Sequence, residues 1–253
     1  MNLHPKLLVF DLDGTLSESK QRMSADMGEL LSALLKKMPV AVMSGAGWPQ
    51  FQKQFFPALP PEAHVQHLYI FPDNAAQCFV YRGDAWKPQY DHAFTPAERE
   101  HILAELDAAL KETGIDDAPV RVWGERIEDR GAEIVFSGLG QQAPLDAKKQ
   151  WDPTGEKRKR LRDSLARRLP EFSEAAGGST SVDITRKGIT KAYGINRLTE
   201  LTSILISEML YVGDALNEGG NDAVVVDTGI RTHAVFGPEE TKGLIESLLN
   251  IHM

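Results

Sequence analysis

Two carboxylates stand one residue apart near the start of the chain, in the run Asp11-Leu12-Asp13-Gly14-Thr15. The apolar run 7–10 precedes them, and its length and composition are typical of a strand buried on both faces of a parallel sheet. Ligands of such sheets bind outside the carboxyl ends of the strands. There, one carboxylate can attack a phosphorus atom while the other transfers the proton of the leaving or entering oxygen. Taken alone, the Asp-x-Asp spacing also fits a polar strand end that caps a helix.

The two carboxylates would repel each other and would also repel a phosphate. A divalent cation removes both problems, and carboxylate oxygens are hard ligands of the kind that Mg²⁺ prefers. If the pair acts on phosphate, the sequence therefore predicts Mg²⁺ as the cofactor.

The charge, the cysteine count and the lengths of the apolar runs exclude several classes of binding partner. The chain has 253 residues and a formal net charge of −8, so no general basic field exists for nucleic acid or an anionic membrane. The single cysteine, Cys78, excludes an internal disulfide framework and fits a reducing compartment. No apolar run approaches the length of a spanning helix, and none resembles a signal peptide. We expect a soluble cytoplasmic protein without a nucleic-acid or membrane partner.

Strands and helices alternate at both ends of the chain. After the first strand, we expect a helix over 24–37 and strands over 40–43 and 67–71. The alternation returns after Gly188, with expected helices at 190–201 and 238–249 and expected strands at 209–212, 223–227 and 233–236. This pattern predicts an α/β fold with a Rossmann-like, doubly wound parallel sheet.

The middle of the chain has a different pattern. Long helices are expected at 95–112 and 156–169, the first with a threonine cap, a proline and a glutamate in capping-box spacing. Between and after them lie short candidate strands at 120–123, 127–129, 133–137 and 181–185. We therefore expect an inserted α+β domain over 88–186, with a core formed by 1–87 and 187–253.

Four strings match one known superfamily in the right order. The run at 11–15, followed by Leu16, resembles the first motif of the haloacid dehalogenase superfamily. Ser44 after the second strand resembles the second motif, and Lys191 resembles the third. Gly213-Asp214, followed by Gly219-Gly220-Asn221-Asp222, resembles the fourth. The resemblance covers the whole chain, and the inserted segment falls where this superfamily places a C2-type cap.

The resemblance implies a role for each motif residue. Asp11 would be the nucleophile that forms an aspartyl phosphate, and Asp13 would be the general acid and base. Ser44 and the amide of Gly45 would bind phosphate oxygens, and Lys191 would neutralise the transferring group.

The metal site follows from the same motifs. Asp214 would complete the Mg²⁺ shell with the Asp11 carboxylate and the Asp13 carbonyl. Asp222 would support the metal or Lys191, and Asn221 would stand behind it as an outer partner.

Strings in the insertion resemble the eukaryotic-type α-phosphomannomutases. Ile127-Glu128-Asp129-Arg130-Gly131 is similar to their Ile-Glu-Phe-Arg-Asn. The strings at 135–140 and 177–183 are similar to their Asn-Val-Ser-Pro-Ile-Gly and Gly-Gly-x-x-Ser-Phe-Asp. By this resemblance, the residues that contact a sugar phosphate would be Arg130, Ser181, Asp183, Lys148 and Lys20.

The chain departs from the mutases at three arginines, which are here Lys20, Gln141 and Lys148. A mutase must hold a bisphosphate in two orientations, and lysine or glutamine cannot form the bidentate contacts of arginine. We therefore expect Mg²⁺-dependent hydrolysis of a small phosphomonoester, a sugar phosphate by resemblance. The alternatives are a phosphohexomutase and a non-catalytic sugar-phosphate-binding protein. A monomer and a cap-mediated homodimer both fit the sequence.

Overall fold

The computed structural model describes residues 5–115, 121–217 and 220–251. The chain divides into two compact units. The first combines Met1–Asp91 with Ile189–Met253, and we call it the core unit. The second is His92–Gly188, and we call it the inserted unit.

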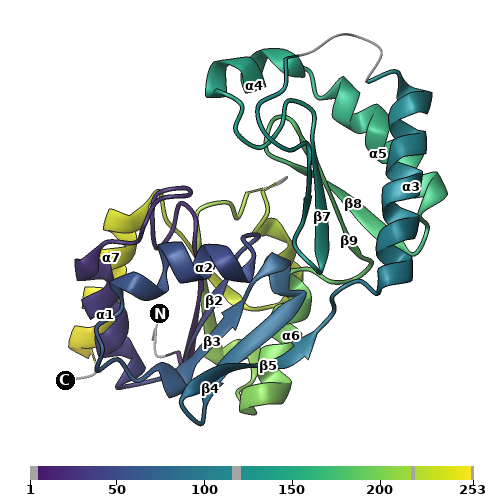
Figure 1. The fold of residues 1–253 in the computed structure, drawn as a ribbon. Coiled ribbons are helices and arrows are strands. Elements are labelled where there is room, and N and C mark those ends of the chain that lie inside the picture. Colours follow the sequence, from purple (N-terminus) through teal and green to yellow (C-terminus); the bar gives the residue numbers. More distant parts are fainter. Residues whose placement is uncertain (1–4, 116–120, 218–219, 252–253) are drawn as a thin grey trace. The chain divides into compact units, whose positions relative to one another are not determined.

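The core unit is built on one mixed sheet with the strand order β11-β10-β1-β2-β3-β4-β5 in the described residues (Figure 1). The strands from β11 to β3 are parallel, and the hairpin β4–β5 extends the sheet in antiparallel fashion. The bounds are β1 (Leu7–Asp11), β2 (Val40–Met43), β3 (Leu68–Phe71), β4 (Gln77–Arg82), β5 (Ala85–Asp91), β10 (Met209–Gly213) and β11 (Arg231–Ala234).

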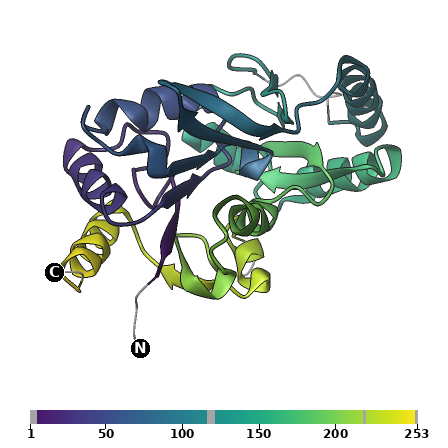
Figure 2. The same ribbon diagram turned by 90° about the horizontal axis from the view of Figure 1, so that it is seen from below.

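Helices cover both faces of this sheet. Leu8 and Phe10 of β1 pack in one cluster with α1 (Ala25–Leu35), α2 (Trp48–Gln54) and α7 (Pro238–Ile251). Leu7 and Val9 point to the other face and pack with α6 (Lys191–Thr202). Figure 2 shows α1 and α7 side by side, and α6 lies apart from them. This arrangement confirms the doubly wound α/β fold expected from the alternation of strands and helices.

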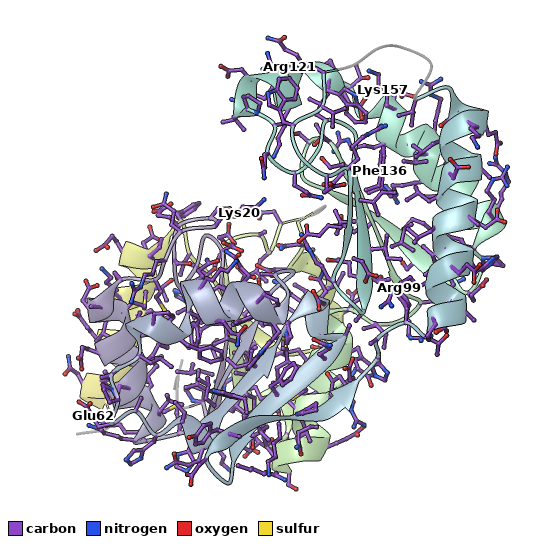
Figure 3. All side chains as sticks on the ribbon, in the orientation of Figure 1. Lys20, Glu62, Arg99, Arg121, Phe136 and Lys157 are labelled. Carbon is purple, nitrogen blue, oxygen red and sulfur yellow. The ribbon has the colours of Figure 1, made fainter. Side chains whose placement is uncertain are left out.

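The inserted unit has an antiparallel sheet with the order β6-β7-β9-β8. Phe136 lies between this sheet and the helices, where it packs with Leu106 and Leu161 (Figure 3). Because side chains alternate along a strand, Glu133, Val135 and Ser137 point to the opposite face. The bounds are α3 (Pro96–Thr113), β6 (Ile127–Asp129), β7 (Glu133–Ser137), α4 (Leu145–Trp151), α5 (Glu156–Arg168), β8 (Phe172–Gly177) and β9 (Ser181–Arg186).

The predicted start of α3 is confirmed in atomic detail. The Thr95 side chain accepts from the Glu98 amide, while the Glu98 carboxylate accepts from the Thr95 amide at 2.7 Å. Gly114 ends the helix in the left-handed conformation, with φ of 64°.

Two expected strands are wrong where the structure describes them. The run 223–227 forms part of the 3₁₀ helix η5 (Ala223–Thr228), because its contacts are with α6 and only Val225 of its residues is buried. Residues 121–123 form no strand, and Val120 lies outside the described residues. The helix α4 and the strand β8 were not predicted from the sequence. Among the described helices, none has the length and apolar character needed to cross a bilayer.

Candidate active site

The carboxyl end of β1 carries a buried ion pair. Asp11 is 2% exposed, and its Oδ1 accepts from the Lys191 ammonium at 2.5 Å. The same ammonium donates to Asp222 Oδ1 at 2.6 Å. Lys191 is 1% exposed although it is the first residue of α6, whose N-terminus approaches β1. The structure therefore brings together three residues that the motifs had predicted from distant parts of the chain.

Tyr211 belongs to the same cluster and was missed by sequence reasoning. Its hydroxyl donates to Asp222 Oδ1 at 2.6 Å, and the amide of Ala215 donates to Asp222 Oδ2 at 3.3 Å. Asp222 is thus fixed by donors on both oxygens and in turn fixes Lys191. The only sequence signal for Tyr211 was its position in β10, two residues before Gly213.

Three carboxylates in the described residues could hold a metal ion. Asp11, Asp214 and Asp222 each offer one oxygen, and these oxygens lie within 4.8 Å of one another. Asp11 Oδ2 is buried and accepts a hydrogen bond from no described residue, as expected for an oxygen that a cation would satisfy. An all-oxygen donor set fits a hard divalent cation.

The remaining predicted metal residues lie differently. The Asp13 side chain is outside this carboxylate group, so the expected contribution of its carbonyl stays a prediction. Asn221 is exposed, and its role as an outer partner also stays a prediction.

Two glycines allow the backbone to pass close to the carboxylates of Asp214 and Asp222. A β-carbon on Gly14 would stand 2.5 Å from Asp214 Oδ2, and Gly14 also has a φ of +84°. A β-carbon on Gly213 would stand 2.4 Å from Asp222 Oδ2. Any larger residue at either position would displace a carboxylate of the cluster.

The electrostatics of the cluster are dominated by burial. Burial raises the pKa of Asp11 to about 7, the Lys191 charge opposes this rise, and the Asp222 and Asp214 charges add to it. Burial and the charge of Asp222 also raise the pKa of Asp214. For Lys191, burial disfavours the ammonium, but the two carboxylates outweigh it and raise the pKa. The metal-free cluster therefore holds a proton near neutral pH that a cation would displace.

Mg²⁺ affinity is expected to depend on pH in this region. Protons and Mg²⁺ compete for Asp11, so apparent affinity should rise by up to about tenfold per pH unit below pH ~7 and level off above it. Calorimetry in buffers of different ionisation enthalpy would detect the released proton. The Asp11→Asn variant should show both effects less strongly, because only Asp214 of the raised-pKa carboxylates remains, and pH-independent binding by the wild type would contradict the expectation.

Asp13 is held by two donors next to the cluster. Its Oδ1 accepts from the amide of Lys20 at 2.6 Å and from the Gln54 side chain at 3.0 Å. Gln54 is 2% exposed and also donates to the Ser17 hydroxyl at 2.7 Å. No described residue donates to Asp13 Oδ2, which suits an oxygen that must exchange a proton with substrate.

Sequence patterns did not identify either donor to Asp13. Gln54 was missed, because a glutamine at the end of α2 carries no motif. Lys20 was predicted to contact a sugar phosphate, and this role stays a prediction. It belongs to the core unit, where its backbone amide donates to Asp13 as the chain turns after the first motif.

Replacing Asp13 with asparagine is expected to lower kcat by about 10²–10⁴-fold, the usual contribution of one general acid and base. The change keeps the acceptor for Lys20 and Gln54, so the loop should stay in place. Single-turnover kinetics with p-nitrophenyl phosphate and a less acidic alkyl phosphate would check it. The loss should be larger for the alkyl ester, whose leaving oxygen needs the proton. An equal loss for both would argue against the acid role.

Ser44 lies at the carboxyl end of β2 and is 1% exposed. Its amide donates to the Phe71 carbonyl, and its hydroxyl oxygen accepts from the Ala46 amide at 3.0 Å. The hydroxyl proton is therefore directed away from Ala46 and can be donated to an anion. Gly45 follows directly, so both predicted phosphate-binding residues lie in the loop after β2, beside the strand that carries Asp11.

In the inserted unit, Arg130 is surrounded by acids. Its guanidinium donates to Glu133 at 2.8 Å and to Glu128 at 2.9 Å. The Glu133 side chain is 1% exposed, whereas that of Glu128 is 43% exposed. Glu133 was missed by sequence reasoning, because nothing in the string marked it as the partner of Arg130.

The other predicted sugar-contacting residues lie in the same sheet or near it. Ser181 pairs with Ser137 and Asp183 with Val135, so both lie on the sheet face opposite the helices, as Glu133 does. Lys148 donates to the Gln141 carbonyl at 3.4 Å. Two positions that differ from the mutase pattern are thus neighbours, and Arg130, Ser181 and Asp183 share one polar face.

Comparison with known proteins gives the family. The family model described as eukaryotic phosphomannomutase matches residues 27–251. The chain belongs to the eukaryotic phosphomannomutase family. A probable phosphomannomutase of Caenorhabditis elegans is 26% identical over 250 residues, covering 96% of this chain and 95% of that protein. A phosphomannomutase of Schizosaccharomyces pombe is 26% identical over 263 residues, covering 98% and 96%.

Solved structures of other proteins are similar in fold to this phosphomannomutase-family chain. A haloacid dehalogenase-like hydrolase from Bacteroides thetaiotaomicron matches with a TM-score of 0.63 at 17% identity, covering 98% of this chain and 99% of that one. Plasmodium falciparum IMP-nucleotidase matches with a TM-score of 0.72 at 18% identity, covering 98% and 62%. This family member is therefore an enzyme with a haloacid dehalogenase-like fold.

Proposed function

We propose that the protein is a Mg²⁺-dependent phosphomonoester hydrolase that forms an aspartyl phosphate on Asp11. The observation that carries the proposal is the buried contact of Asp11 with Lys191 at 2.5 Å, within a cluster of three carboxylates able to bind a cation. Mg²⁺, when bound by Asp11 and Asp214, would offset the negative charge of the phosphate.

The chemistry of the chain's own residues has two steps. Asp11 attacks the phosphorus, the ester P–O bond breaks, and Asp13 gives its proton to the leaving oxygen. Water then attacks the aspartyl phosphate and gives a proton to Asp13, which releases phosphate and restores Asp11. Lys191 stays charged throughout, because Asp222 remains as its partner when the Asp11 carboxylate is phosphorylated.

The distinction between a hydrolase and a mutase rests on the inserted unit. A mutase must retain a bisphosphate, and Arg130 is the residue that the family pattern offers for the phosphate that is not transferred. Here two carboxylates already neutralise that guanidinium. The next position at which the family pattern has an arginine is occupied by Gln141 in this chain. An anion would have to compete with the buried Glu133 carboxylate for Arg130. This charge balance favours a substrate with a single phosphate, and we take a sugar phosphate as its class.

A phosphomannomutase is the second candidate, because the relatives of similar length carry that name. Phosphorus NMR with Mg²⁺ and mannose 1-phosphate, with and without catalytic glucose 1,6-bisphosphate, separates the two. We expect free phosphate to accumulate in both samples. A 6-phosphate signal that grows only with the bisphosphate would instead establish the mutase. Failure to produce either signal with any sugar phosphate would reject both candidates.

Substituting Glu133 with glutamine is expected to improve the binding of glucose 1,6-bisphosphate by about tenfold, the worth of one charge-assisted hydrogen bond. The side chain keeps its shape, and one negative charge beside Arg130 is removed. The inhibition constant of the bisphosphate against p-nitrophenyl phosphate turnover measures the effect. Glu128→Gln is the matched control, with a smaller gain expected because that carboxylate is more exposed. Unchanged inhibition in Glu133→Gln would show that Arg130 does not bind phosphate.

A further inference from the structure

Three consecutive residues after β3 adopt a left-handed backbone. Asp73, Asn74 and Ala75 have φ values of 50°, 54° and 69°. Side chains other than glycine rarely adopt this conformation, which costs about 1–2 kcal/mol per residue. The other non-glycine cases in the described residues are isolated, at Lys20, Asp84 and Ser203. Such strain persists only where the surroundings over-determine it, and it is concentrated at functional sites.

Contacts on two sides hold the strained turn in place. The amide of Asn74 donates to the Ser44 carbonyl at 2.9 Å, and the amide of Asp73 donates to the Ala46 carbonyl at 3.1 Å. On the other side, Ala75 is fully buried against α6, where a β-carbon on Gly194 would stand 2.6 Å from the Ala75 methyl. The turn thus fits between the loop that carries Ser44 and the helix that begins at Lys191.

This backbone places the Asn74 carboxamide beside the candidate phosphate loop. Its Nδ2 and Oδ1 lie 3.4 Å and 3.5 Å from the point where a β-carbon of Gly45 would stand. The side chain is half-buried and makes no hydrogen bond to another described residue. An amide group can donate from its nitrogen and accept at its oxygen. The Ser44 hydroxyl, one residue from Gly45, is likewise available as a donor.

We propose that the Asn74 carboxamide contacts the substrate phosphate, donating to an oxygen that stays on phosphorus, and that the strained turn exists to hold it there. The proposal rests on the proposed phosphate site at Ser44 and Gly45. The interaction involves no change of bonds in Asn74. It adds a neutral donor to a site whose positive charge comes from Lys191 and the cation.

Asn74→Gly tests the proposal, because glycine suits the observed φ and removes the carboxamide. We expect kcat/KM for p-nitrophenyl phosphate to fall by about 10²-fold, as on loss of one preorganised donor. The inhibition constant of orthovanadate should rise in parallel, while the melting temperature stays equal or rises. Asp84→Gly and Ser203→Gly are matched controls that relieve a single left-handed residue outside this turn, and they should leave kcat/KM unchanged.

A second variant covers the possibility that Asn74→Gly fails to fold. Asn74→Asp keeps the size and the tolerance of the left-handed region but places a negative charge against the phosphate. It should weaken vanadate inhibition at least as strongly. Wild-type kcat/KM and vanadate inhibition in either folded variant would overturn the proposal.

Failure of the proposed hydrolase function can be distinguished from failure of the Asn74 proposal. If the wild type hydrolyses no phosphoester, calorimetric titration of vanadate into the Mg²⁺-loaded protein replaces the kinetic measurement. Weaker binding by the Asn74 variants than by the wild type would then still support the contact. Absence of vanadate binding by the wild type, or equal binding by all proteins, would reject it.

Discussion

Replacing Asp11 with asparagine is expected to lower kcat by about 10⁴-fold or more, as on loss of the nucleophile in other covalent enzymes. The amide cannot form the aspartyl phosphate. It is the same size as the carboxyl group and can still accept from Lys191, which also keeps Asp222 as its partner. The fold should therefore stay intact, and removal of a buried carboxylate should not lower the metal-free stability near pH 8.

Steady-state turnover of p-nitrophenyl phosphate and mass spectrometry of the acid-quenched enzyme would check this expectation. The wild type should carry phosphate on the peptide that contains Asp11, and the variant should not. Asp84→Asn, in the exposed hairpin turn, is the control for loss of one aspartate. Near-normal rates in Asp11→Asn would disprove the covalent mechanism.

Replacing Lys191 with methionine is expected to lower the free energy of unfolding by about 3–5 kcal/mol at pH 8, the cost of leaving a buried charge without its partner. Methionine fills a similar volume, so the loss is electrostatic. Without the ammonium, the carboxylates of Asp11 and Asp222 face each other in a buried site. Turnover should also fall by about 10²–10³-fold, because a charge that stabilises the transferring phosphoryl group is removed.

The stability loss has a predicted pH dependence. The folded-state pKa of Asp11 lies above its unfolded value, and removal of Lys191 raises it further. At pH 5 the Asp11 carboxyl of the variant is protonated, so one buried negative charge is gone. The deficit should therefore be smaller at pH 5 than at pH 8, growing by up to about 1.4 kcal/mol per pH unit as the pH rises above about 7. Urea unfolding of both proteins in chelator measures it.

Lys187→Met provides the control for that experiment, since Lys187 is exposed and the change removes only a 3.4 Å contact with the Pro170 carbonyl and a minor attraction to Glu174. Its stability should match the wild type at both pH values. A Lys191→Met deficit that is equal at pH 5 and pH 8 would show that the carboxylates are not the source of the cost.

The sequence was sufficient to predict the positions of residues that lie at the end of a strand or the start of a helix. Asp11 and Ser44 follow continuous apolar runs, Lys191 starts a helix after a glycine turn, and parallel strands end at one edge of a sheet. Local propensity also predicted α3 with its cap, because capping depends on residues three apart. Such features are encoded within a few residues, and the family resemblance added their chemical roles.

Tertiary structure alone decided which side chains satisfy one another across the chain. Tyr211 supports Asp222, Gln54 holds Asp13, and Glu133 neutralises Arg130. No local pattern marks these partners, because a buried charge selects its neighbour by distance in the fold and not by spacing in the chain. The left-handed turn at Asp73–Ala75 was equally invisible, since no glycine signals it. Motif spacing therefore determined where phosphoryl chemistry could occur, and tertiary packing decided which charges remain available to a substrate.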